Sequence, residues 1–327
     1  MTQVYLDHAA TTYLYPEVIE EMTQVMMQEY GNPSSTHARG RAAKVILESC
    51  RKRIAAQLGA SALEILFTSG GTEANNWIIQ NAVEQLGVKR IITTKTEHHA
   101  VLYPVLEMQK KYGIEVEFLP VSPKGQIDPK VLELLLQQPI KTLVSIMHVN
   151  NETGVIHNIQ ALGTLCHEHQ AYFHSDTVQS VGKMTLSLQD LPVDFITASA
   201  HKFHGPKGVG FLFVRKNIPM LPLFFGGEQE KGLRAGTEPL HQIAGMTLAL
   251  ELSLKQLPET SVKVKTLRSE ALRLFEERLP GCSINGSLDG FYTILNLQLP
   301  ISEEKAAMLL FFLDLKGIAV SRGSACQ

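Results

Sequence analysis

A lysine near the middle of the chain, Lys202, lies in a setting that suits covalent chemistry. It belongs to the segment Ser199-Ala200-His201-Lys202-Phe203-His204-Gly205-Pro206, between an apolar run that ends near residue 198 and a second run over residues 211–214. A lysine that is removed from water loses its proton near neutral pH and becomes a nucleophile toward carbonyl groups. A lysine that caps a turn or pairs with a carboxylate would have similar surroundings, so this segment alone leaves both interpretations open.

A glycine-rich turn is the second chemical feature. Residues 64–68 predict a strand, and Ser69-Gly70-Gly71-Thr72 lead from it into a helix that we expect to end near Leu86. Free backbone amides and the positive end of a helix attract anions, and glycines let a phosphate come close. The turn lacks the GxGxxG and GKT patterns of nucleotide sites. It therefore favours a single phosphate monoester.

Further polar residues follow the ends of other expected strands. Strands are predicted over residues 90–94, 116–119, 141–146 and 171–176, and helices alternate with them. This alternation is typical of an α/β fold with a mostly parallel sheet, whose ligand site lies at the carboxyl ends of the strands. The side chains expected at that edge are those of Thr72, His98, Asn151, Asp176, Gln179 and Lys202.

The last third of the chain has a looser pattern. A glycine-rich loop covers residues 224–237, and helices are predicted over residues 240–256 and 262–279, separated at Pro258. A strand over residues 291–297 and a helix over residues 305–315 then indicate a smaller α+β domain. We therefore predict a large domain over residues 12–257 and a small domain formed by residues 1–11 and 258–327.

Composition excludes several classes of function. The chain has 327 residues, 44% of them hydrophobic and 19% charged, as in soluble globular proteins. A net charge of -2 provides no basic surface for nucleic acid, and no apolar run is long enough to span a membrane. The start of the chain shows no secretory signal, so a cytoplasmic location is expected. Cys50, Cys166, Cys282 and Cys326 lack metal-ligand spacing, so we expect reduced thiols and no metal site.

Four of these features together match what pyridoxal phosphate requires. The cofactor needs a lysine for its aldehyde, a phosphate site, a carboxylate that keeps the ring nitrogen protonated, and a flat group over the ring. Lys202, the Gly71-Thr72 turn, Asp176 and His98 meet those needs in that order. Asp176 could instead cap the end of a strand, and His98 could be a buried structural histidine. For the cofactor interpretation to be wrong, all of these simpler interpretations would have to hold at once, so we favour the cofactor.

The chain resembles the NifS/IscS-like cysteine desulfurases, which are class V enzymes of pyridoxal phosphate fold type I. The resemblance extends from residue 7 to the last residue and rests on ordered motifs: residues 7–12 (Asp-His-Ala-Ala-Thr-Thr), 31–35 (Gly-Asn-Pro-Ser-Ser), 69–76, 96–100, 150–154 (Asn-Asn-Glu-Thr-Gly), 176–182, 199–210 and 234–237. It implies a large domain with a sheet of the seven-stranded type, a smaller α+β C-terminal domain, and L-cysteine as substrate.

The resemblance also implies a role for each candidate residue. Lys202 would bond to the aldehyde of the cofactor, Asp176 would pair with the ring nitrogen, and Gln179 would bind the ring oxygen. His98 would stack on the ring and assist proton transfer, and Asn151 would lie beside ring and substrate. The phosphate would be held by Gly71, Thr72, Ser199 and His201, and by Thr237 of a neighbouring subunit, which makes a homodimer necessary for the site.

Cys326 would carry the sulfur. As a thiolate it would attack the sulfur of the substrate, leaving alanine, and then pass a persulfide to an iron–sulfur scaffold or a thiolation partner. Family members continue beyond this cysteine, and the arginine that binds the substrate carboxylate lies in that continuation, so the small domain is expected to be incomplete. Arg234 is an alternative partner for the carboxylate.

Other functions remain open from the sequence. A selenocysteine lyase shares much of the site, and a class V aminotransferase would have no need of Cys326. A truncated, inactive homologue that serves as a sulfur-transfer scaffold is a further alternative, from a different class of function.

Overall fold

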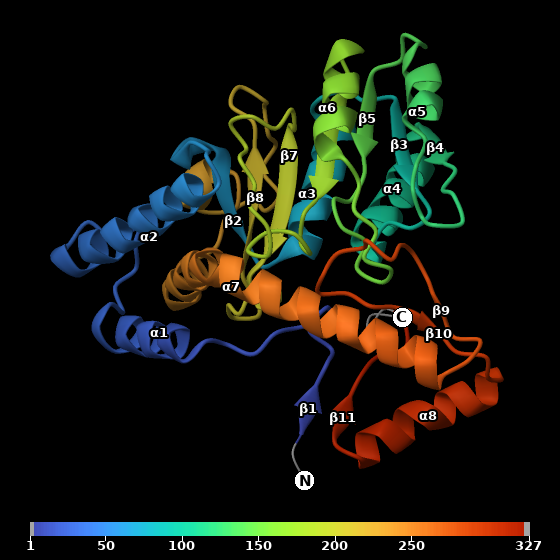
Figure 1. Ribbon diagram of the computed structural model, residues 1–327. Coiled ribbons are helices and arrows are strands. Elements are labelled where there is room, and N and C mark those ends of the chain that lie inside the picture. Colours follow the sequence, from blue (N-terminus) through green and yellow to red (C-terminus); the bar gives the residue numbers. More distant parts are fainter. Residues whose placement is uncertain (1–2, 324–327) are drawn as a thin grey trace.

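Seven strands form one mixed sheet in the computed structural model, which describes residues 3–323 (Figure 1). The strand order is β2-β8-β7-β6-β5-β3-β4. β8 is antiparallel to both of its neighbours, and every other pairing is parallel. The predicted α/β class and mostly parallel seven-stranded sheet are therefore confirmed. The strand bounds are β2 (Ile65–Thr68), β3 (Arg90–Thr94), β4 (Glu115–Leu119), β5 (Thr142–Ser145), β6 (Tyr172–Asp176), β7 (Phe195–Ser199) and β8 (Gly210–Val214).

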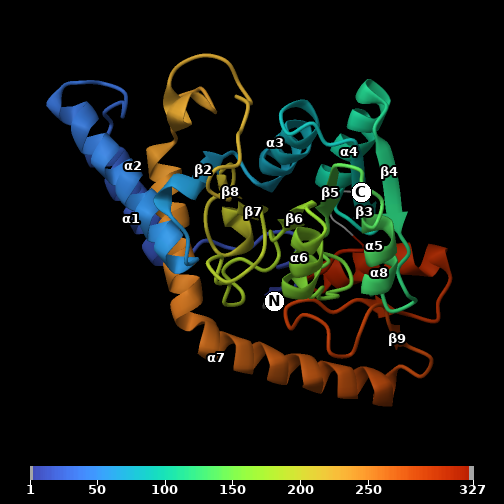
Figure 2. The same cartoon turned by 90° about the horizontal axis from the view of Figure 1, so that it is seen from above.

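Helices cover both faces of this sheet, as Figure 2 shows for α3 and α4 on one side and α5 and α6 on the other. Alternate side chains of a strand point to opposite faces of the sheet, so each strand contributes to the apolar cluster on either face. In β8, Phe211 and Phe213 belong to one cluster, and Leu212 and Val214 belong to the other. The first cluster takes in α1 (Pro16–Gln28), α2 (Ala38–Gln57), α5 (Pro129–Leu136), α6 (Ile159–Glu168) and the first part of α7, and the second takes in α3 (Gly71–Glu84) and α4 (His99–Tyr112).

One long helix, α7, runs from Leu240 to Arg278 with Pro258 inside it. The prediction of two helices separated at Pro258 is therefore wrong. A proline removes one hydrogen bond from the helix ladder, and a helix can continue past it when its turns on both sides are otherwise favourable. The buried residues of α7 all lie before Pro258, so the second half extends beyond the core of the large sheet. The predicted domain boundary at residue 257 stays a prediction.

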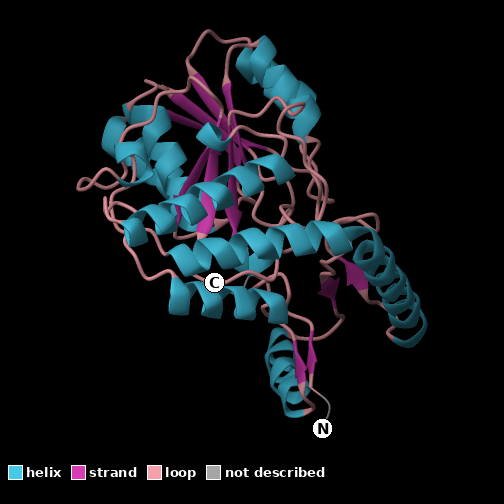
Figure 3. Cartoon of the chain, turned by 90° about the vertical axis from the view of Figure 1, so that its left-hand side faces the viewer, coloured by secondary structure: helices cyan, strands magenta, loops and turns pink. Residues whose placement is uncertain are grey.

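Two short pairs of strands lie away from the large sheet (Figure 3), and helix α8 lies beside one of them (Figure 1). β1 (Val4–Tyr5) pairs in parallel with β11 (Ile318–Ala319), so the start of the chain lies beside its last described strand. β9 (Ser283–Ile284) pairs with β10 (Leu297–Gln298), and α8 spans Glu303–Leu315, which confirms the predicted helix there. No described helix has both the length and the apolarity needed to cross a membrane.

The strand predicted over residues 291–297 is wrong except at its last residue. Phe291 and Ile294 are buried against Val149 instead of alternating across a sheet. The amide of Phe291 donates to the carbonyl of Gly154 at 2.6 Å, so this apolar run closes over the turn at residues 150–154 as a loop. These apolar side chains are therefore buried by the loop itself, without pairing to a neighbouring strand.

A buried ion pair anchors the glycine-rich loop of residues 224–237. Both oxygens of Glu230 accept from the Arg51 guanidinium, at 2.7 and 2.6 Å, and the amide of Phe67 donates to the same carboxylate at 2.9 Å. Arg51 also donates to the carbonyl of Ile65 at 2.8 Å. Since Glu230 adopts a left-handed conformation with φ of 46°, the ion pair holds backbone that would otherwise relax.

Removal of the Glu230 carboxylate should therefore destabilise the protein strongly. Glu230→Ala leaves the buried Arg51 charge with only the exposed Glu48 carboxylate, at 3.3 Å, as a partner, and we expect the free energy of unfolding to fall by about 3 kcal/mol. Urea denaturation followed by circular dichroism measures this. Glu228→Ala, at an exposed glutamate of the same loop, is the matched control and should change stability by less than about 0.5 kcal/mol. Equal effects of the two substitutions would contradict the anchoring role.

Candidate active site

The polar residues singled out in the sequence gather at the carboxyl edge of the sheet. Ser199 and Asp176 end the adjacent strands β7 and β6, and Lys202 ends a short 3-10 helix, η2 (Ala200–Lys202), directly after β7. Gly71 begins α3 just after β2. His98 precedes α4 after β3, and Asn151 lies in the turn that follows β5.

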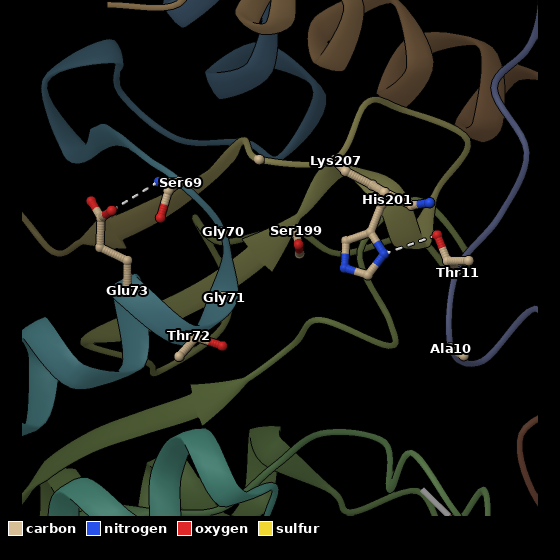
Figure 4. A pocket seen from close by; sticks show the side chains of 11 residues that line it. Ala10, Thr11, Ser69, Gly70, Gly71, Thr72, Glu73, Ser199, His201 and Lys207 are labelled. Carbon is tan, nitrogen blue, oxygen red and sulfur yellow. Dashed lines mark hydrogen bonds between the residues drawn. The ribbon is translucent and has the colours of Figure 1, made fainter. Parts of the chain in front are cut away.

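A cavity of about 390 Å³ opens at the start of α3 (Figure 4). Within residues 3–323, the first-turn amides of Gly71 and Thr72 have no acceptor. A side chain at Gly71 would lie 2.6 Å from Val178 Cγ2, so only glycine fits there. The cavity thus has the unpaired amides and helix end of an anion site. Its lining consists of Ala10, Thr11, Ser69, Gly70, Gly71, Thr72, Glu73, Ser199, His201, Lys207 and Gly208.

His201 forms one side of this cavity. Its Nδ1 lies 3.2 Å from the Thr11 hydroxyl, the contact drawn in Figure 4. Burial lowers the pKa of His201 to about 4, and the positive charges of Lys202, Lys207 and Lys183 contribute. The imidazole is therefore neutral at pH 7 unless an anion lies nearby.

Lys202 points toward the N-terminal loop. Its Nζ donates to the carbonyls of Ala9 and Ala10 at 2.6 and 2.8 Å, and it is not part of the cavity lining. The loop is held in place by Thr12, whose amide and hydroxyl both donate to the carbonyl of His201 at 2.9 Å. The sequence indicated a loop of small residues at positions 7–12 but gave no sign that its carbonyls would hold the lysine.

Asp176 is buried and has two hydrogen bonds. Its Oδ2 accepts from the Asn75 side chain at 2.7 Å, and its Oδ1 accepts from the amide of Val178 at 3.0 Å. Sequence reasoning assigned no role to Asn75, although an amide on the inward face of an otherwise apolar helix was an available signal. Asn75 keeps the carboxylate oriented.

His98 caps α4. Its Nδ1 accepts from the amide of Ala100 at 3.0 Å, so a proton on the neutral ring is carried by Nε2. Burial is the main cause that lowers the pKa of His98; the charge of Asp176 opposes this effect and that of Lys202 adds to it. His98, Asp176 and Lys202 are therefore close enough to influence one another. His98 thus has a structural role as the cap of α4 and also lies near the candidate site residues, so the two predicted interpretations do not exclude each other.

Asn151 is presented by a turn that its neighbour organises. Asn150 accepts from the amides of Glu152 and Thr153 at 3.0 and 2.8 Å, and its side-chain nitrogen donates to the carbonyl of Thr96 at 2.9 Å. The turn after β5 is in this way fixed to the segment that leads to His98. Asn151 is half-buried at this position.

Gln179 connects two lysines. Its Nε2 donates to the carbonyl of Ala9 at 2.9 Å, and its Oε1 accepts from Lys183 Nζ at 3.0 Å. Lys183 was not among the predicted site residues. Burial lowers its pKa to about 7, and the charge of Lys202 contributes.

Thr237 lies apart from this group of residues, and Cys326 is not described. Thr237 is exposed and lines a separate cavity of about 310 Å³ beside Tyr30 and Asn32. Cys326 lies outside the described residues. Arg234, the alternative carboxylate partner, pairs with Glu73 at 3.0 and 3.2 Å at the start of α3.

Several histidines near this edge are buried and uncharged. Burial lowers the pKa of His174 to about 3 and the pKa values of His148 and His157 to about 4. The unfolded chain binds protons at these histidines at a higher pH than the folded chain does. The stability that comes from burying the neutral histidines is therefore complete above about pH 6.5. It is lost progressively as the pH falls toward 4.

Acid should therefore destabilise the protein before its carboxylates titrate. For His157 alone, we expect the free energy of unfolding to fall by about 2 kcal/mol between pH 6.5 and pH 5. Urea denaturation at both pH values measures the fall. His157→Leu should remove this part of it, whereas His169→Leu, at a partly exposed histidine, should leave the fall unchanged. An identical fall in wild type and His157→Leu would contradict the interpretation.

The fold is a mixed α/β sheet that gathers a half-buried lysine, a buried aspartate and an anion-type cavity at its carboxyl edge. The sequence matches the class V aminotransferases over residues 4–327, and the chain belongs to that family, whose members are known as pyridoxal phosphate enzymes.

Individual relatives agree with this assignment. The cysteine desulfurase IscS of Dictyoglomus turgidum is 42% identical over 327 residues, which cover 99% of this chain and 82% of that protein. Among solved structures, a NifS-like protein is similar with a TM-score of 0.92 and 37% identity, covering 98% of this chain and 88% of that one. SspA in complex with cysteine is similar with a TM-score of 0.86 and 32% identity, covering 99% of this chain and 90% of that one. The predicted NifS/IscS-like resemblance and fold type I are confirmed.

Proposed function

We propose that this chain is a pyridoxal phosphate-dependent cysteine desulfurase, which converts L-cysteine to L-alanine and retains the sulfur as a persulfide. The observation that carries the proposal is that Asp176 ends β6 and Lys202 follows the adjacent strand β7, near an anion-type cavity, in a chain similar to cysteine desulfurases over nearly its whole length.

The residues fit the cofactor. The unpaired amides of Gly71 and Thr72, together with Ser199 and His201, would hold its phosphate in the cavity at the start of α3. Asp176, oriented by Asn75, would hold the ring nitrogen in its protonated form, because a buried carboxylate stabilises a neighbouring positive charge. Gln179 would bind the ring oxygen and His98 would cover the ring. When bound, pyridoxal phosphate takes up the electrons released at the substrate α-carbon.

The protein's own groups would then move protons and exclude water. Lys202 Nζ, which the carbonyls of Ala9 and Ala10 hold, would bond to the cofactor and, when displaced by substrate, hold the α-proton. His98 would exchange a proton through Nε2, because its Nδ1 is occupied by the amide of Ala100. Asn151 would lie beside the substrate, at the end of a turn fixed by Asn150.

Sulfur transfer is assigned to Cys326. Its thiolate would attack the substrate sulfur, forming a sulfur–sulfur bond as the bond from sulfur to the substrate β-carbon breaks, and the released electron pair and a proton would complete alanine. The persulfide would pass to an iron–sulfur scaffold or another sulfur acceptor. We also propose a cytoplasmic homodimer, in which Thr237 completes the phosphate site of the neighbouring subunit. The separate cavity at Thr237 is compatible with such an interface.

Cofactor and substrate chemistry are tested by absorbance. The purified protein supplied with pyridoxal phosphate should show a visible band that changes when L-cysteine is added, with alanine formed. Lys202→Ala should lose the visible band of covalently bound cofactor and lower alanine formation by more than about 10³-fold. Lys44→Ala, at an exposed lysine of α2, is the control and should behave as wild type. A wild-type protein that shows no band would contradict the proposal.

The role of Cys326 has its own test. In Cys326→Ser the cofactor band and its response to L-cysteine should remain, because the thiol is not needed for binding. Alanine formation and persulfide on the protein should be lost. Cys282→Ser, at a free and partly buried cysteine, should keep both. Undiminished alanine formation in Cys326→Ser would favour another class V activity, and preferential turnover of selenocysteine by the wild type would favour a selenocysteine lyase.

A further inference from the structure

Lys183 is a buried amine that the proposed reaction leaves without a role. The residue is 8% exposed, and among the ion pairs of residues 3–323 none includes it. A buried lysine that lacks a carboxylate partner is costly, which is reflected in its pKa of about 7. Such a group persists at a site only if its hydrogen bonding serves a purpose or if other packing compensates for it.

The hydrogen bonds of Lys183 lead directly to the candidate site. Its Nζ donates to Gln179 Oε1 at 3.0 Å, and Gln179 Nε2 donates to the carbonyl of Ala9 at 2.9 Å. The same carbonyl accepts from Lys202 Nζ at 2.6 Å. Lys183, Gln179, Ala9 and Lys202 therefore form one continuous chain of contacts that ends at the lysine proposed to bond the cofactor.

This chain allows only one orientation of the Gln179 amide. A carbonyl can only accept, so the nitrogen of the amide must face Ala9, and the amide oxygen then faces Lys183, which donates. The opposite orientation would place the amide oxygen against the carbonyl of Ala9 and leave Lys183 without an acceptor. The second hydrogen of the amide nitrogen remains available for another acceptor.

We propose that Lys183 is a positioning residue for cofactor binding, because it holds the Gln179 amide with its NH₂ group toward the side of Lys202. This inference rests on the proposed function, in which Gln179 binds the ring oxygen of the cofactor. With Lys183 in place, two contacts fix the orientation in which Gln179 presents a donor to that oxygen. Without Lys183 only the carbonyl of Ala9 opposes the flipped orientation, in which the amide oxygen would repel the ring oxygen.

The surroundings of Lys183 keep it in place from three parts of the chain. The hydroxyl of Tyr292, in the loop near β10, donates to the carbonyl of Lys183 at 2.9 Å. The titratable groups that its charge influences are His8 of the N-terminal loop, His201 and His204 after β7, and Lys202. All four are cationic when protonated, so the oxygen of Gln179 is the acceptor that stabilises the amine.

A double-mutant cycle tests the inference. The dissociation constant for pyridoxal phosphate is measured by absorbance titration of apo protein for wild type, Lys183→Met, Gln179→Ala and the double variant, together with the wavelength of the visible band. Each single variant should bind about tenfold more weakly, as for one lost hydrogen bond to a charged group. The double variant should bind no more weakly than Gln179→Ala alone, because Lys183 acts through Gln179. Both substitutions should shift the band in the same direction.

Two further variants serve as controls. Lys124→Met removes the same charge at an exposed lysine with no ion pair among the described residues, and it should leave the dissociation constant unchanged. Lys183→Gln keeps a donor for the amide oxygen and should restore most of the affinity. Thermal melting of the apo proteins shows whether Lys183→Met folds, and Lys183→Ala takes its place if it does not.

The outcomes separate this inference from the proposed function. Wild-type affinity and band position in Lys183→Met, or losses that multiply to about a hundredfold in the double variant, would overturn the positioning role while cofactor binding stands. Failure of Lys183→Gln to improve on Lys183→Met would also count against it. Failure of the wild type to bind pyridoxal phosphate would overturn the proposed function, and this inference with it.

Discussion

The site depends on one backbone carbonyl, that of Ala9, which accepts hydrogen bonds from both Lys202 and Gln179. This carbonyl belongs to a loop that is fixed at both ends. Thr12 fastens it to His201, and on the other side β1 pairs with β11 while Ser321 donates to Asp7 at 2.9 Å. The placement of the lysine therefore depends on residues from the start, the middle and the end of the described chain, although only the middle segment carries the lysine.

The topology of the sheet explains how a glycine turn after β2 comes close to the lysine after β7. The two strands are separated by β8, whose antiparallel direction places its first residue, Gly210, at the same edge as the ends of β2 and β7. A side chain at Gly210 would lie 2.3 Å from the carbonyl of Ala198 and 2.8 Å from the Cα of Gly70. The absence of a side chain thus lets the turn approach β7, which forms the wall of the anion cavity.

Much of this arrangement was accessible from the sequence, because apolar runs followed by polar residues specify strands and their functional ends locally. The errors lie where tertiary contacts override local signals. Pro258 predicted a break that the long helix α7 tolerates, and the apolar run from Phe291 packs as a loop over the turn at Gly154. Asn75 was missed because its partner, Asp176, comes close to it only when the sheet forms. Lys183 was missed because nothing in the sequence indicates that it pairs with Gln179.

The positive charges at the cavity and just behind it would suit an anion as the occupant. Lys202, Lys183 and Lys207 all contribute to the low pKa of His201, and burial and Lys202 hold the pKa of Lys183 near 7. In the protein alone, these cationic groups repel one another, and two of them respond by releasing protons near or below neutral pH. A phosphate among them would favour their charged forms, which raises both pKa values. Binding of a phosphate would then be coupled to proton uptake, so its affinity would be greater at pH 7 than at pH 9. The low pKa values of His201 and Lys183 thus reduce the repulsion among these groups without a ligand, and both groups can take up a proton when a phosphate binds.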